Sequence, residues 1–200
     1  HALLPGAAAR LFAHYPQARL AVTPQESPLL EEWMAAQRFD LGLSEQETAP
    51  AGTQALALLA LDEVCVLPAG HALAARAVLR AQDFAGQPFV SLSADDPYRR
   101  QIDAVFEQAG VTRQLRVQTH NAVAVCAMVE QGLGLAIVNP LTALACASER
   151  LLWRPLAFSI PFRVQALLPL HRPALPEVQP LLQALQDEAA ALARRLSPIG

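Results

Sequence analysis

The chain has 200 residues, of which 53% are hydrophobic and 16% charged, and its formal net charge is −3. This composition excludes a disordered chain and is sufficient for one domain or two small domains with real cores. Apart from histidine, the basic residues are all arginines scattered along the chain. Because nucleic-acid surfaces need clustered basic residues, we expect this segment alone to bind DNA poorly.

Helical and strand-like hydrophobic periodicities alternate along the chain. Helices are predicted over residues 3–15, 27–37, 96–110, 121–131, 139–148 and 177–196. Strands are predicted over residues 18–23, 39–44, 55–61, 63–68, 88–93, 114–119, 134–138 and 163–170. Alternation of this kind predicts an α/β fold with largely parallel sheets covered by helices.

The turn-rich stretch at residues 67–88 interrupts this alternation. We interpret it as a crossover between two α/β lobes. On this interpretation the chain builds one lobe, crosses over, builds the second lobe, and returns for its last strand and helix.

Short polar residues stand at four places where a predicted strand gives way to a helix. Three of them are followed by proline, at Ser27–Pro28, Asp96–Pro97 and Asn139–Pro140, and the fourth is the stretch 119–121. Such residues cap the free N–H groups of a helix, and proline is preset for the first helical position. In a parallel sheet these junctions share the carboxyl edge, where α/β folds bind ligands. Helix capping alone is the alternative.

Catalytic interpretations of the polar residues are weaker. Ser93 has no glycine-flanked elbow around it, and neither His71 nor His120 has a partner at metal-ligand spacing. Asp95 and Asp96 are adjacent, so their side chains do not face each other. We therefore predict no catalytic residue, no cofactor and no metal site, and we expect that the chain is not an enzyme.

The cellular compartment is predicted from the cysteines and from the absence of a recognisable targeting signal. The three cysteines, at 65, 126 and 146, lie among aliphatic residues without metal spacing, which predicts buried, reduced thiols in a cytoplasmic protein. No apolar run is long enough for a membrane span, and no secretion signal precedes the first helix. The opening "HALLPG" lacks an initiating Met, so we interpret the chain as a piece of a longer protein.

Several stretches resemble the effector-binding domain of LysR-type transcriptional regulators. They are "LLPGAAARLFAHYPQARLAV" at residues 3–22, "FDLGL" at 39–43 and "CVLPAGHALA" at 65–74. Longer matches such as "PQESPLLEEW", "LDEVCVLPAGH", "PYRR", "VCAMV" and "VNPLTAL" resemble the founding member of the family, an activator of lysine biosynthesis that controls the gene for diaminopimelate decarboxylase. The resemblance covers all 200 residues.

The resemblance implies a two-lobed fold like that of the type 2 periplasmic binding proteins, with an effector cleft between the lobes. Lobe I would comprise residues 1–67 and 164–200, and lobe II residues 68–163. The family's DNA-binding winged helix-turn-helix would lie upstream of this chain. The family domain also has a strand before "LLP", so the first strand of lobe I is expected to be missing here.

The resemblance further implies that diaminopimelate is the effector, with lysine as the alternative. Such a ligand needs carboxylates for its ammonium groups, and arginine or helix N–H groups for its carboxylates. Glu45, just after the predicted strand 39–44, is the first choice for an ammonium partner, and a solvated acid in a loop is the alternative. Arg99 is expected to clamp a carboxylate, or else to form a surface ion pair with Asp103 one turn later. The predicted effector-binding residues are Ser27, Glu45, Ser91, Ser93, Asp95, Asp96, Arg99, Thr119, Asn121 and Asn139.

The partners that the resemblance implies are a second copy of the chain and, through the upstream domain, DNA. Family members pair these domains side by side as homodimers or homotetramers, which predicts contact between helix 3–15 of one copy and helix 121–131 of another. No membrane partner is expected. The alternative function is a solute-binding protein of an amino-acid transport system, which shares the fold.

Overall fold

The structure, a computed structural model, describes residues 2–25 and 27–196. The chain divides into two compact units: unit 1 runs up to Leu61 and resumes at Arg163, and unit 2 is Asp62–Phe162. The sequence had placed the first boundary after residue 67. The strand Val64–Pro68 belongs instead to unit 2, because both of its neighbours in the sheet are strands of that unit.

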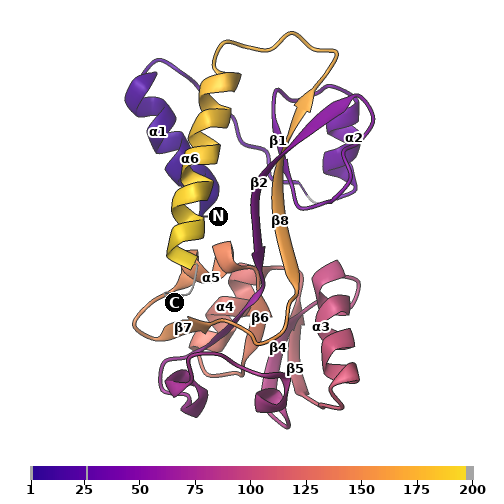
Figure 1. Ribbon diagram of the computed structural model, residues 1–200, viewed down its shortest axis with the longest axis vertical. Coiled ribbons are helices and arrows are strands. Elements are labelled where there is room, and N and C mark those ends of the chain that lie inside the picture. Colours follow the sequence, from indigo (N-terminus) through magenta and orange to yellow (C-terminus); the bar gives the residue numbers. More distant parts are fainter. Residues whose placement is uncertain (1, 26, 197–200) are drawn as a thin grey trace. The chain divides into compact units, whose positions relative to one another are not determined.

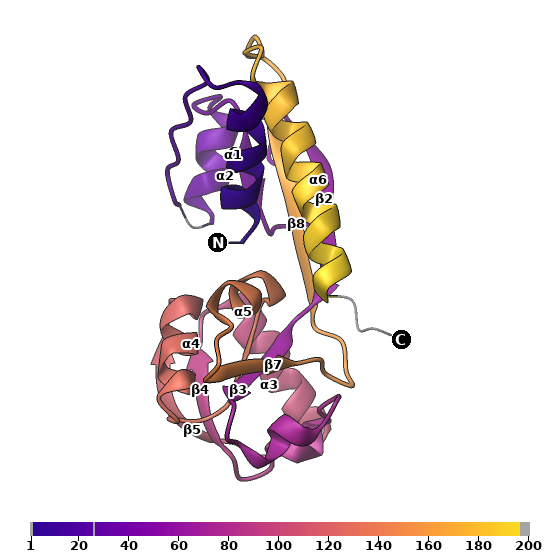
Figure 2. The ribbon, with the colours of Figure 1, turned by 90° about the vertical axis from the view of Figure 1, so that its left-hand side faces the viewer.

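Unit 1 packs helices against a three-stranded sheet in the order β1-β8-β2. Its elements are α1 (Leu3–His14), α2 (Leu29–Ala35), β1 (Gly42–Ser44), β2 (Thr53–Asp62), β8 (Pro161–Pro169) and α6 (Val178–Leu196). Strands β1 and β8 are antiparallel, with Ser44 opposite Gln165. Helices α1 and α6 lie side by side (Figures 1 and 2).

Helix α1 buries Leu3, Ala7 and Leu11, which recur every four residues and therefore form one stripe. Helix α6 buries a matching set of leucines and alanines along its length. Outside this apolar seam, Arg10 Nε of α1 donates to Glu188 Oε2 of α6 at 2.8 Å. The apolar pattern thus explains why these helices, at opposite ends of the chain, pack together.

The predicted strand at 18–23 is wrong. Residues 18–25 belong to no helix or strand, and Val22 is exposed. Alternating apolar residues form a strand only where a neighbouring strand accepts their backbone hydrogen bonds, and no described strand pairs with this segment.

Unit 2 holds the remaining elements of the described residues. They are β3 (Val64–Pro68), two short 3₁₀ turns (Ala72–Ala75 and Ala81–Phe84), β4 (Pro88–Leu92), α3 (Pro97–Gln108), β5 (Gln114–Thr119), α4 (Ala122–Glu130), β6 (Ala136–Val138), α5 (Pro140–Cys146) and β7 (Leu151–Arg154). The 3₁₀ turns lie in the stretch interpreted as a crossover, and β7 was not predicted.

The expectation of largely parallel sheets is wrong. Strands β4 and β5 are parallel, but β3 is antiparallel to both β6 and β7. The register explains the direction of β3: its first residue, Val64, lies opposite Val138, the last residue of β6. The chain therefore enters unit 2 at the edge where β6 ends, and β3 has to run the opposite way. Hydrophobic periodicity carries no information about strand direction.

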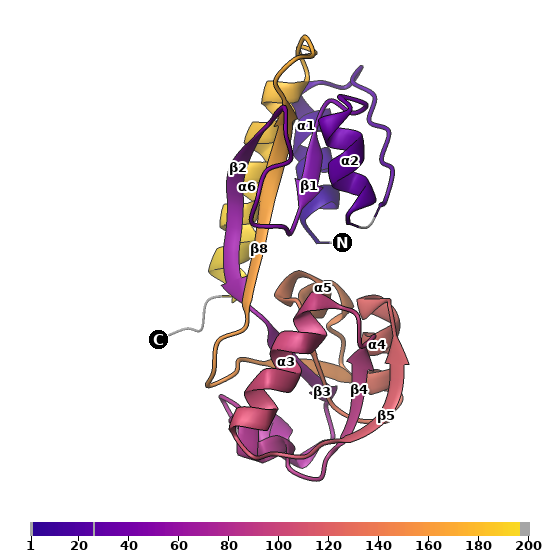
Figure 3. The ribbon, with the colours of Figure 1, turned by 90° about the vertical axis from the view of Figure 1, so that its right-hand side faces the viewer.

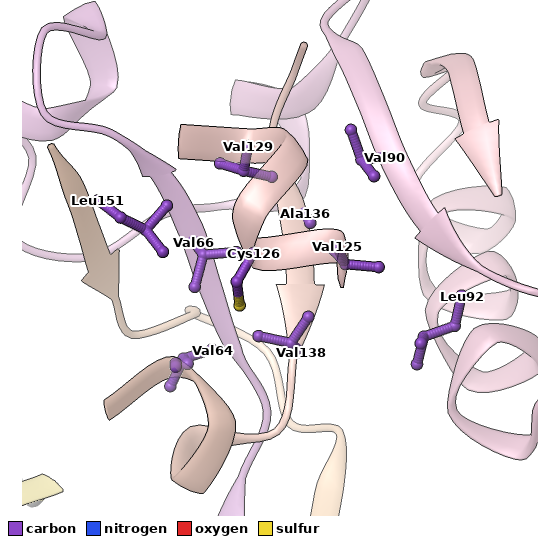
Figure 4. Close-up of a cluster of buried hydrophobic side chains, with 11 residues drawn as sticks. Val64, Val66, Val90, Leu92, Val125, Cys126, Val129, Ala136, Val138 and Leu151 are labelled. Atoms are coloured by element: carbon purple, nitrogen blue, oxygen red, sulfur yellow. The ribbon is translucent and has the colours of Figure 1, made fainter. Parts of the chain in front are cut away.

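The core of unit 2 consists of two clusters on opposite faces of its strands. Val90 and Leu92 of β4 pack with Val125 and Val129 of α4 (Figure 4). Phe89, which points to the other face, packs with buried residues of α3. Helix α3 lies beside β4 (Figure 3). The alternation of side chains along β4 thus assigns one helix to each face.

Candidate ligand-binding site

Three strands of unit 2 end at the same edge. Strands β4 and β5 are parallel, and Leu92 lies opposite Thr119 at their carboxyl ends. A parallel bridge between Phe89 and Leu135 sets the register of the following strand, so that β6 ends beside β4 at Val138. The prediction that polar strand-to-helix junctions meet at one edge is therefore confirmed within unit 2.

The polar residues at three of these junctions cap helices. Asp96 Oδ1 accepts from the backbone N–H groups of Tyr98 at 2.8 Å and Arg99 at 3.2 Å. Asn121 Oδ1 accepts from the N–H groups at 123 and 124, and Asn139 Oδ1 from that at 142. Their capping role is confirmed, and their predicted role in ligand binding stays a prediction.

Replacing Asp96 with Ala should lower the free energy of unfolding by about 1 kcal/mol, because two N–H groups of α3 lose their acceptor. Chemical denaturation measures the change. Asp95→Ala is the matched control, since Asp95 is exposed and its carboxylate caps no helix among the described ones. Equal effects of the two substitutions would contradict the capping role.

The other predicted residues of unit 2 differ in exposure. Ser91 of β4 is 1% exposed, and its Oγ has no hydrogen-bond partner in the described part of the chain. Ser93 and Thr119 are half-buried, and Thr119 Oγ1 accepts from the N–H of Asn121 at 3.3 Å. Asp95 is exposed, and its carboxylate lies 3.9 Å from His120 Nδ1.

Arg99 pairs with Asp103, which was the alternative to a carboxylate clamp. Its Nε donates to Asp103 Oδ2 at 2.7 Å, and its Nη1 donates to the carbonyl of Leu92 at 3.0 Å. Arg99 is only 9% exposed, so this is not the surface ion pair that was expected. The arginine opposes the dipole of α3, yet it ties the helix to the end of β4 and is neutralised by Asp103.

Sequence reasoning missed Arg113. Its guanidinium donates to the other oxygen of Asp103 and stacks on two rings, 4.6 Å from the centroid of Phe89 and 4.2 Å from that of Phe106. Burial lowers the pKa of the Arg113 guanidinium, and the hydrogen bond with Asp103 opposes that change. Asp103 thus accepts hydrogen bonds from two arginines. The spacing of Arg99 and Asp103 along the helix does not show that Arg113 also binds this carboxylate.

In unit 1, Ser27 does not cap helix α2, and this prediction is wrong. The helix begins at Leu29 after Pro28, without a side-chain cap. The hydroxyl of Ser27 donates instead to Glu31 Oε1 at 2.8 Å, which removes it from the cap position. Ser44 Oγ, at the end of β1, donates to the same oxygen at 2.9 Å and accepts from the N–H of Gln46 at 3.1 Å.

The predicted acid Glu45 is exposed. The sequence did not point to two other acids, Glu31 and Glu63. The carboxylate of Glu31 is held by the serines just described, and its position four residues after Ser27 was the available signal. Glu63 is 1% exposed and directly precedes Val64, at the edge where β6 ends. The acidic pair Asp62–Glu63 between two apolar strands was its only mark in the sequence.

The three cysteines are free thiols. Cys65 and Cys126 are buried and Cys146 is partly buried, and none of the three is in a disulfide. Burial raises the pKa of the Cys126 thiol to about 12, and the neighbouring Cys146 contributes to the increase. Within residues 2–25 and 27–196, no group of three or more metal-ligating side chains is assembled, and no helix is long and apolar enough to cross a membrane.

Comparison with known proteins identifies relatives. The family described as "LysR substrate binding domain" matches residues 1–190. Transcriptional activator protein LysR of Escherichia coli is 47% identical over 196 residues, which is 98% of this chain and 63% of that protein. The chain therefore spans less than two thirds of that relative's length.

Solved structures show the same fold. The reduced regulatory domain of OxyR from Pseudomonas aeruginosa has a TM-score of 0.75 at 16% identity, over 92% of this chain and 90% of that one. The CcmR regulatory domain of Synechocystis PCC6803, in complex with 2-PG, has a TM-score of 0.74 at 14% identity, over 92% of this chain and 89% of that one. The predicted fold like that of the periplasmic binding proteins is confirmed.

Proposed function

Because the chain belongs to the LysR-type transcriptional regulators, as their substrate-binding domain, we propose that it senses an amino-acid-like metabolite and controls lysine-biosynthesis transcription. The proposed effector is diaminopimelate, with lysine as the alternative. The observation that carries the proposal is the 47% identity over 98% of the chain to a transcriptional activator of this family.

The chemistry of the polar groups supports a ligand of this class. Diaminopimelate carries an ammonium and a carboxylate at each end, and each unit offers groups that suit them. Unit 1 presents the Glu31 carboxylate between two serine hydroxyls. Unit 2 presents Ser91, a buried hydroxyl without a hydrogen-bond partner among the described residues, one residue before the carboxyl end of β4.

The proposed mechanism is a population shift. A ligand that contacts polar groups of both units favours the arrangement in which both contacts form, by no more than its difference in affinity for the two states. The arrangement of the units is then passed to DNA-binding domains through a homo-oligomer in which α1 of one copy meets α4 of another. The chain acts as a sensor, and its proposed partners are the effector, further copies and, through the upstream domain, DNA.

Calorimetric titration of this chain tests the effector. We expect saturable binding of diaminopimelate or lysine, because both carry the ammonium and carboxylate groups that the polar residues suit. Pimelate, which has the same carbon chain without ammonium groups, is the matched control and should bind at least ten times more weakly. Absence of binding by both amino acids would overturn the proposed effector and leave the family membership standing.

A further inference from the structure

Glu31 carries a carboxylate that the chain orients but does not neutralise. Both serine hydroxyls donate to Oε1, whereas Oε2 is buried and has no hydrogen-bond partner among the residues described. None of the ion pairs found between described residues includes Glu31. An ionised carboxylate accepts up to four hydrogen bonds, so half of its capacity is unused.

Such an arrangement is unfavourable by itself. A buried carboxylate oxygen without a donor loses its hydration and gains nothing in return. The two hydroxyls come from different places, one before α2 and one at the end of β1, and Ser44 is only 2% exposed. The carboxylate is therefore fixed in direction before any ligand arrives, which lowers the cost of ordering it on binding.

From this geometry we propose that Glu31 is the anchor for an ammonium group of the effector, a role that the sequence had suggested for Glu45. The inference rests on the proposed function, because it assumes a ligand with a primary ammonium group. An ammonium donates up to three hydrogen bonds, and a charge-assisted bond to Oε2 satisfies the oxygen that the protein leaves without a donor.

The other acids fit this role less well. Glu45 is exposed, and an exposed ion pair gains little because water and salt screen it. Oε2 of Glu31 is shielded from solvent, so the ammonium reaches it only with a local rearrangement. Ser27 is exposed and Ser44 is buried, which places that rearrangement on the Ser27 side.

A purely structural role for Glu31 makes a different prediction. The carboxylate joins α2 to β1 through the serines, and an amide oxygen at the same place would accept the same two hydrogen bonds. Glu31→Gln should therefore keep the two hydrogen bonds from Ser27 and Ser44 and remove only the charge. If Glu31 only holds α2 to β1, this substitution leaves ligand binding unchanged.

The test is calorimetric titration of the unaltered chain, Glu31→Gln and Glu45→Gln with diaminopimelate and with lysine. We expect Glu31→Gln to weaken binding about 10- to 100-fold, the range of one charge-assisted hydrogen bond, and Glu45→Gln to stay within about twofold. Circular dichroism checks that each variant is folded. Glu31→Asp, which keeps the charge but withdraws it by one methylene, is the second variant and should also bind more weakly.

The outcomes separate the two proposals. If the unaltered chain binds and Glu31→Gln binds equally well, or if Glu45→Gln alone loses binding, the inference about Glu31 is overturned and the proposed function stands. If the unaltered chain binds neither amino acid, the proposed effector is overturned together with its anchor.

Discussion

Replacing Gly134 with Ala should lower the free energy of unfolding by about 3–5 kcal/mol. A Cβ at this position would lie 2.5 Å from the carbonyl oxygen of Pro88 and 3.0 Å from the backbone nitrogen of Phe89. Both atoms belong to β4, and the Pro88 carbonyl also accepts from the N–H of Leu135 at 2.9 Å. Backbone held in a sheet cannot move aside, so the close contact and the strained φ of +154° both have to be accommodated.

Gly132→Ala is the matched control for this substitution. Gly132 also has a positive φ, of +80°, but a Cβ there meets nothing within 4 Å. It should therefore lose only the conformational term, about 1–2 kcal/mol. Denaturant unfolding of the two variants measures the difference, and a difference below about 1 kcal/mol would contradict the close packing of Gly134 on β4.

Replacing Asp103 with Ala should lower the free energy of unfolding by about 2–4 kcal/mol. The substitution removes the counter-charge of two guanidiniums, and the side chains of Arg99 and Arg113 are only 11% and 12% exposed. Removing one partner of a buried ion pair leaves an uncompensated charge, which is costlier than the pair is favourable. Asp103 is itself 43% exposed, so water partly screens the effect, and the expected loss is smaller than the about 3–5 kcal/mol of a fully buried pair.

Glu107→Ala is the control for Asp103. Glu107 lies on the same helix one turn later, is exposed, and forms no ion pair with any residue in the described ranges. Its removal should change the free energy of unfolding by less than about 0.5 kcal/mol. Denaturation midpoints compare the two, and an Asp103 effect as small as that of Glu107 would show that the arginines do not depend on this carboxylate.

Most helices and strands could be predicted, because each follows from neighbouring residues. The buried residues of α6 recur with a period near 3.6. The pair Asp96–Pro97 is typical of a helix start and predicts where α3 begins. The exceptions depend on partners. The segment 18–23 alternates like a strand but has no partner strand among those described, and Ser27 precedes a helix but donates to a carboxylate instead.

The candidate site could be predicted only in part. The capping residues were found because a cap is read from its position just before a helix. Glu31, Ser44 and Arg113 were missed, because each is defined by contacts with residues from another element. Glu45 was preferred to Glu31 because it follows a strand end, and no local pattern shows which of two acids has its charge shielded from water.

The sequence alone determined the alternation of helices and strands, the helix starts and the family, since all of these reside in local residue order. Tertiary structure decided the direction of β3, the two arginines that share Asp103, and the orientation of the Glu31 carboxylate. The physical reason is that hydrogen bonds and ion pairs between elements depend on distance in space. The chain brings Ser27, Glu31 and Ser44 together only once α2 and β1 have packed.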